Sequence, residues 1–322
     1  MNRAAAGRSP AGRRGALTPK QTREQIDAQA RRTLDRQRLR AAHAAFDQVS
    51  PAVGQLDATA FRKELARDGD AAVALLAEMA VATDPVLRRE ARRLANRLLP
   101  ALGRAANPRR RGTRRIVSRA GALEGDLDLD RTLERSLGRR PQHAHELVAR
   151  QFAAAPRAVC LLVDRSGSMS GHAVALAAVA GAAVVSARGE RLRCSVVAFS
   201  SEPLVLLSDL HVRPAGAVVD DLLSLRGHGT TDLARALRVA AELLERVPPG
   251  GRTAVLLSDG LHTKGADPLS AAGLLDCLHV LGTSAEPDSV SAATALARRG
   301  RGRYLPATTL VQMTESLEQL LG

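Results

Sequence analysis

The stretch VCLLVDRSGSMSGH, residues 159–172, decides the fold, because an apolar run typical of a buried strand passes directly into one aspartate and three serines. An extended segment places alternate side chains on one side, so Asp164, Ser166 and Ser168 would converge there as one carboxylate and two hydroxyls. Hard cations prefer such oxygen ligands. The alternative, that a serine of this stretch only caps the helix that follows, would explain one serine but not the set.

Short apolar runs alternate with amphipathic or Ala-rich helical segments from Ala158 onward. The runs read AVCLLVD, RLRCSVVAFS, RTAVLLSDG, LDCLHVLGTS and GRYLPA. This alternation predicts an α/β fold with a doubly wound, mostly parallel sheet that is covered by helices on both faces. Ligands of such sheets bind at the carboxyl ends of the strands, and the segment DRSGSMS lies at such an end.

Two later segments also place oxygen-bearing side chains at strand or loop ends. Thr230 and Thr231 lie in the Gly-flanked loop of RGHGTTDLARAL, before a predicted helix, and Asp259 follows the apolar run of TAVLLSDG. Three strand or loop ends therefore offer oxygens in order along the chain. Mg²⁺ prefers six oxygens and keeps several waters, so a few hydroxyls and one or two carboxylates are enough to hold it.

These motifs resemble the von Willebrand factor A (VWA) domain, a Rossmann-like fold. Its metal-ion-dependent adhesion site combines D-x-S-x-S after the first strand with a Thr and an Asp from later loops. The resemblance covers residues 158–322, about half of the chain. It implies a site for Mg²⁺, with Mn²⁺ as the alternative, and a partner protein that supplies an acidic residue to the metal. The implied ligands are Asp164, Ser166, Ser168, Thr231 and Asp259, with Thr230 as the neighbouring alternative to Thr231.

The acidic segment DLDLDRTL, residues 126–133, comes shortly before this region. It begins like a calcium-binding EF-hand loop, but Arg131 replaces the required Gly and Leu137 stands where the bidentate Glu belongs, so we expect no calcium site. The segment resembles the region before the A domain of bacterial proteins that work with MoxR-type AAA+ ATPases, including CoxE-like maturation factors. That resemblance implies an adaptor or co-chaperone that acts with a separate ATPase in assembling or metallating a client enzyme.

Composition divides the chain into four parts. We expect a disordered basic tail over residues 1–18, a helical basic region over residues 19–106, a linker and pre-VWA segment over residues 107–155, and the VWA domain over residues 156–322. The Pro/Gly/Arg-rich break at residues 107–119 predicts that the helical region folds separately and that proteases cut there first.

The net charge of +14 comes entirely from the first half of the chain. Residues 1–150 hold 31 of the 47 basic residues but only 17 of the 33 acidic ones. A cluster of arginines over residues 109–115 makes nucleic-acid binding the main alternative function, since such clusters bind phosphates. Aromatic residues make up only 2% of the chain, which argues against base stacking of the single-strand kind. The cluster would suit an acidic protein surface equally well.

Enzyme motifs are missing from the sequence, so we expect a binding protein rather than an enzyme. The G-x-S-x-G motif of a hydrolase nucleophile elbow is absent, because Met169 stands at the position that the serine would occupy. A hydrolase triad of Ser168, Asp259 and His262 would draw Asp and His from one loop, whereas the usual triad takes them from separate loops. No Walker-type nucleotide loop occurs. His172, His228 and His262 lie near the three loops, and we interpret them as histidines beside a polar site rather than as ligands.

The three cysteines, Cys160, Cys194 and Cys277, lie inside apolar runs without a C-x-x-C pair. They are typical of reduced core residues, which favours a cytosolic protein. The N-terminus has no apolar run of the secretory kind, and the longest apolar stretch, residues 173–187, is too short and Ala-rich to cross a bilayer. We therefore expect a cytoplasmic location without membrane insertion.

Overall fold

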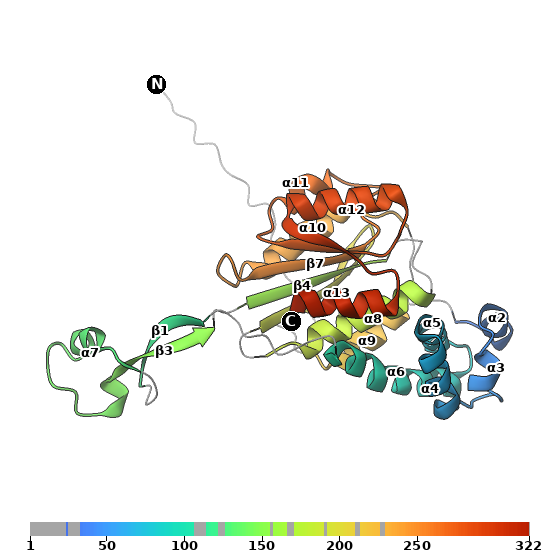
Figure 1. Cartoon of the computed structure of the whole chain (residues 1–322), viewed down its shortest axis with the longest axis horizontal. Coiled ribbons are helices and arrows are strands. Elements are labelled where there is room, and N and C mark those ends of the chain that lie inside the picture. Colours follow the sequence, from blue (N-terminus) through green and yellow to red (C-terminus); the bar gives the residue numbers. More distant parts are fainter. Residues whose placement is uncertain are drawn as a thin grey trace, which may run out of the picture.

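The computed structural model centres on a six-stranded sheet with helices on both faces, a further layer of N-terminal helices, and a projecting arm (Figure 1). It describes residue 24 and residues 33–105, 114–121, 126–154, 157–165, 171–189, 192–209, 213–225 and 229–321.

The strand order of the sheet is β6-β5-β4-β7-β8-β9. All neighbours pair in parallel except β6, which lies antiparallel at the edge beside β5. The doubly wound, mostly parallel α/β fold expected from the sequence is therefore confirmed, whereas β6 was not expected. The strands are β4 (Arg157–Asp164), β5 (Leu192–Phe199), β6 (Pro203–Leu207), β7 (Arg252–Ser258), β8 (Leu278–Gly282) and β9 (Arg301–Pro306).

Helices cover the two faces of the sheet because alternate strand residues point to opposite sides. In β4, Cys160 and Leu162 join an apolar cluster with the helices of one face, while Val159, Leu161 and Val163 join the cluster of the other face. The first face carries α10 (Leu233–Leu244), α11 (Pro268–Ala272) and α12 (Pro287–Arg299). The second carries α8 (Gly171–Ser186), α9 (Ala215–Ser224) and α13 (Leu310–Leu321).

The N-terminal helices form an extra layer on the second face. Aspartates before α2, α4 and α5 accept backbone N–H groups of the first helical turn, which is the usual N-cap and fixes where these helices begin. Helices α5 and α6 pack directly on α8 (Figure 1). The layer consists of α2 (Arg36–Ala42), α3 (Phe46–Val49), α4 (Ala58–Arg67), α5 (Gly69–Met79) and α6 (Pro85–Ala105).

Helix α8 lies between the sheet and this layer, and it is buried nearly all round. Its sequence, GHAVALAAVAGAAVVS, has no polar face, as expected for a helix covered on every side. Gly103 of α6 meets it so closely that an added Cβ would lie 2.6 Å from the backbone nitrogen of Ala183. The N-terminal helices and this face of the sheet share one apolar cluster, which argues against separate folding of the helical region.

A small antiparallel sheet forms the arm, in the segment that the sequence analysis assigned to a linker and pre-VWA region. It contains β1 (Arg114–Ala120), β2 (Asp126–Leu127), α7 (Leu129–Arg135), the 3₁₀ turn η1 (Ala144–Glu146) and β3 (Val148–Ala154), with β3 in the middle. Figure 1 shows the arm extending away from the main sheet. Asp128 is buried and caps α7, and it accepts hydrogen bonds from Ser118 and Arg150. This capping gives the acidic segment a structural role.

Candidate metal site

Asp164 is the last residue of β4, and its buried carboxylate is held from the neighbouring strand β7. The two strands run in register to the pair Val163 and Leu257, so the next residues, Asp164 and Ser258, lie side by side at the carboxyl edge. The Ser258 hydroxyl donates to Asp164 Oδ2 at 2.6 Å, and it accepts the backbone N–H of Gly260 at 3.0 Å. This chain of hydrogen bonds fixes the orientation of the carboxylate.

Thr231 reaches the same edge from the loop before α10. The next residue, Asp232, donates its backbone N–H to the carbonyl of Ser200, which directly follows β5, the other neighbour of β4. The Thr231 carbonyl in turn accepts the N–H groups of Thr263 and Lys264, both at 3.2 Å, from the loop that follows Asp259. Backbone hydrogen bonds therefore tie the Thr231 loop to the loops at the ends of β5 and β7.

Two oxygen atoms at this edge have no protein partner within the described ranges. Thr231 is only 3% exposed, yet its hydroxyl makes no hydrogen bond with any described residue. Asp259 accepts the N–H of Leu261 with Oδ1 at 2.9 Å, while Oδ2 has no partner among those residues. A hydroxyl and a carboxylate oxygen that have no partner among the described residues, at the same edge as the carboxylate of Asp164, fit a hard divalent cation. Thr230, the neighbouring alternative, is exposed.

The backbone after Asp259 requires glycine. Gly260 has φ = 78°, in the left-handed region, and an added Cβ would lie 2.8 Å from the backbone nitrogen of Ala293 in α12. The S-D-G sequence thus combines one residue that orients Asp164, one with a carboxylate oxygen that no described residue binds, and one that allows the turn.

Arg165, for which no sequence motif predicts a role, places a buried positive charge next to Asp164. The side chain is 4% exposed. Burial lowers the pKa of its guanidinium to about 10, and the Asp164 carboxylate partly opposes this shift. At neutral pH the group is still charged, so it offsets part of the negative charge of the two carboxylates. A divalent ion held here would keep a net attraction for an additional anion.

The N-terminal layer also borders this edge, which the sequence did not indicate. Helix α8 begins at Gly171, and an added Cβ there would lie 2.5 Å from Oε1 of Glu78 in α5. Glu78 Oε2 is 3.0 Å from Nε2 of His43. His172 lies beside the Thr308 carbonyl at 3.0 Å and is 3.6 Å from Asp70 of α5. A protein that docks at the carboxyl edge next to α8 would therefore meet α5 as well.

Several residues named from the sequence lie outside the described part of the chain. These are Ser166 and Ser168 of the D-x-S-x-S motif, His228, and the arginines at 109–111. His262 is described and exposed. Among the described residues, no group of three or more His, Cys, Asp or Glu side chains could hold a metal ion. The described part of the candidate site instead combines two carboxylates with hydroxyl groups.

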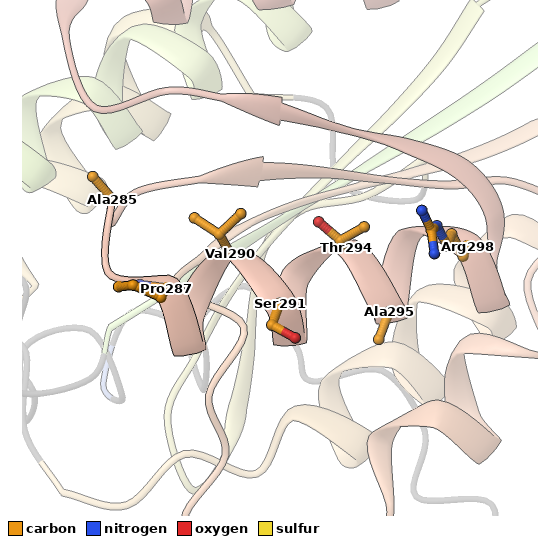
Figure 2. Close-up of a pocket in the computed structure, with 7 residues that line it drawn as sticks. All are labelled: Ala285, Pro287, Val290, Ser291, Thr294, Ala295 and Arg298. Atoms are coloured by element: carbon orange, nitrogen blue, oxygen red, sulfur yellow. The ribbon is translucent and has the colours of Figure 1, made fainter.

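A separate hollow of about 590 Å³ lies along α12 and offers no comparable chemistry (Figure 2). All of its lining residues except Ala285 belong to that helix, and Arg298 is the only charged one. It is a groove on the surface of one helix and contains neither a carboxylate nor a histidine.

Comparison with protein families identifies the chain. The family model described as "VWA domain containing CoxE-like protein" matches residues 72–319, about three quarters of the sequence. The chain belongs to this family. The match begins inside α5, so the region shared with other CoxE-like proteins includes most of α5, all of α6 and the arm as well as the main sheet. VWA domains mediate interactions between proteins, and the CoxE-like chain contains such an interaction domain.

Solved structures resemble about half of this CoxE-like chain at low sequence identity. An aerotolerance-related membrane protein from Bacteroides fragilis is 16% identical, with a TM-score of 0.41, over 51% of this chain and 98% of that one. BatB from Bacteroides thetaiotaomicron is 15% identical, with a TM-score of 0.42, over 51% and 96%. A von Willebrand factor type A protein from Catenulispora acidiphila is 18% identical, with a TM-score of 0.42, over 54% and 44%.

No curated protein sequence matches the chain. In the described part of the chain, every helix is too short or too polar to cross a membrane.

Proposed function

We propose that this CoxE-like protein is a non-enzymatic adaptor that binds a partner protein through a divalent metal, Mg²⁺ in the first instance. The observation that carries the proposal is a pair of oxygens, on Thr231 and Asp259, that have no partner among the described residues and lie at the edge where Asp164 is buried. The resemblance to metal-ion-dependent adhesion sites adds Ser166 and Ser168 to the ligand set. When bound, the metal supplies an undercoordinated positive charge that attracts a carboxylate.

The residues of this chain act by positioning. Ser258 and the N–H of Gly260 hold the Asp164 carboxylate in place, and the backbone hydrogen bonds of Thr231 hold its hydroxyl at the same edge. Arg165 reduces the negative charge of the site, which favours the approach of an acidic side chain from outside. None of these roles requires a reacting nucleophile or a general base, which is why we propose binding rather than catalysis.

The metal part of the proposal is tested by thermal unfolding of the full chain with and without metal. A cation that binds only the folded protein stabilises it by about 2.7 kcal/mol at a concentration of 100 times its Kd. We expect Mg²⁺ or Mn²⁺ to raise the melting temperature, and Asp164→Ala to abolish the increase. The matched pair Thr231→Ala and Thr230→Ala differs only in which threonine is removed, and we expect only the first to weaken the response. If metal raised the melting temperature of both variants equally, Thr231 would not be a ligand of the metal.

We propose that the partner is a MoxR-type AAA+ ATPase. The two proteins would act together in assembling or metallating a client enzyme. The support is the resemblance of the segment before the sheet and the need of the metal for an acidic ligand. In a pull-down with such an ATPase, we expect binding in Mg²⁺, release by EDTA, and weaker binding by Thr231→Ala than by Thr230→Ala. An ATPase that stays bound in EDTA and to both variants would show that docking does not use the metal.

A further inference from the structure

We propose that a second site binds a phosphate group of a small molecule through Arg188 and Arg246. This site lies at the amino-terminal ends of the parallel strands, opposite to the carboxyl ends that form the candidate metal site. These arginines line an open cavity of about 320 Å³. The described lining residues are Arg188, Gly189, Leu192, Arg193, Asp209 and Arg246. Among these described residues three guanidinium groups face a single carboxylate, so together they carry an excess of positive charge.

The cavity lies at the amino-terminal edge of the parallel strands. Leu192 is the first residue of β5, Arg246 follows α10 and precedes β7, and Asp209 follows the antiparallel strand β6. Asp164 and Asp259 lie at the carboxyl ends of β4 and β7 instead. With a rise of about 3.3 Å per residue along β5, the two edges are roughly 23 Å apart. The cavity is therefore separate from the candidate metal site.

The arginines of the cavity are not equally satisfied. Arg193 is paired with Asp209 at 3.2 Å, and Asp209 is the one carboxylate among the described lining residues. Arg188 has a buried Nη1 atom without any hydrogen-bond partner, and Arg246 makes no ion pair with a described residue. A buried N–H donor without an acceptor is destabilising, and more so when the group is charged. An anion in the cavity would remove this cost.

The charge and shape of the cavity favour phosphate over a carboxylate. Two guanidinium groups without a carboxylate partner among the described residues are matched by the two negative charges that a phosphate carries near neutral pH, whereas one carboxylate would neutralise only one of them. Guanidinium groups also bind phosphate oxygens in a bidentate manner. Gly189 adds open space, because a Cβ built there would have no atom within 4 Å.

Titration calorimetry of the full chain with inorganic phosphate and with pyrophosphate tests the proposal. EDTA is present throughout, so that phosphate bound to a metal at the other edge does not contribute. We expect binding that is weakened at least about tenfold by Arg188→Gln and by Arg246→Gln, because each removes charged hydrogen-bond donors. The control Arg238→Gln removes the same charge from an exposed position of α10 outside the cavity, and we expect it to bind as the unmutated chain does.

Two results would overturn the proposal. One is the absence of binding by the unmutated chain at millimolar phosphate and pyrophosphate. The other is an equal loss for Arg238→Gln and for the two cavity variants, which would indicate attraction by overall charge. Arg246 is exposed, so Arg246→Gln is expected to fold even if Arg188→Gln does not. The phosphate affinities of Arg246→Gln and Arg238→Gln alone would then test the proposal. A preference for pyrophosphate over phosphate would support a diphosphate-bearing ligand.

Discussion

The substitution Gly103→Ala tests whether the N-terminal helices are docked on α8. It should stabilise an undocked α6 but lower the unfolding free energy of the docked structure. In an undocked helix, alanine is more favourable than glycine by about 1 kcal/mol. In the structure, the new Cβ would lie 2.6 Å from the backbone nitrogen of Ala183 and 2.7 Å from its Cα. Backbone atoms cannot move aside as a side chain can, so we place the overpacking cost near the upper end of its usual range, at about 3 kcal/mol.

The expected net loss is therefore about 2 kcal/mol of unfolding free energy. For a chain of 322 residues, with an unfolding entropy of about 2.1 cal/mol/K per residue, that corresponds to a drop of about 3 °C in Tm, measured by circular dichroism. Gly69→Ala in α5 is the control, because the nearest atom is the end of the Leu310 side chain at 3.3 Å, which can shift. We expect Gly69→Ala to change the Tm little. A Tm that rises in Gly103→Ala would refute the docked arrangement and support separate folding of the helical region.

Two further predictions concern the arm and the cysteines. The hydrogen bond from Arg150, together with that from Ser118, lowers the pKa of Asp128, so its contribution to arm stability is complete above the unfolded pKa of about 3.9 and is lost as the pH falls through the lower folded value. Amide protection in β3 should fall in that acid range, and Asp128→Asn should remove this part of the pH dependence. Burial raises the pKa of Cys160 and Cys194 to about 12, so iodoacetamide at pH 8 should label the partly exposed Cys277 first, as checked by mass spectrometry. Native labelling of Cys160 would contradict this burial.

The main sheet could be predicted from the sequence because its strands are continuous apolar runs that end in polar residues. β4 and β7 are of this kind, and their ends place Asp164 and Asp259 at one edge. β6 was missed because it is a strand of only five residues at the edge of the sheet and begins with Pro203. The strands of the arm were missed for a different reason. Four of the seven residues of β1, RRIVSRA, are arginine or serine, and its pairs with β3 join residues that are 28–40 positions apart, which no local pattern reveals.

The candidate site was predictable in its ligands but not in its supports. The D-x-S-x-S, T and D positions follow from the motifs, because the residue types that hold a hard cation are few. The hydroxyl of Ser258 and the guanidinium of Arg165 act on Asp164 through geometry, and neither residue type signals such a role by itself. Glu78 is a stronger example, because it reaches the start of α8 from a helix ninety residues earlier in the chain.

Helix α8 contained the signal that would have revealed the N-terminal layer. A helix that covers one face of a sheet and meets water on the other needs a polar stripe, and the stretch from Val174 to Val185 has none. Its Ala and Gly residues are too small to fill the space against a distant neighbour, but they allow a second helix to approach closely, as Gly103 does at Ala183. An Ala-rich helix without a polar stripe next to a parallel sheet therefore requires cover on its outer side. In this chain only the helices before the arm supply it among the described residues, and they extend the layer to the edge where α8 begins beside Glu78.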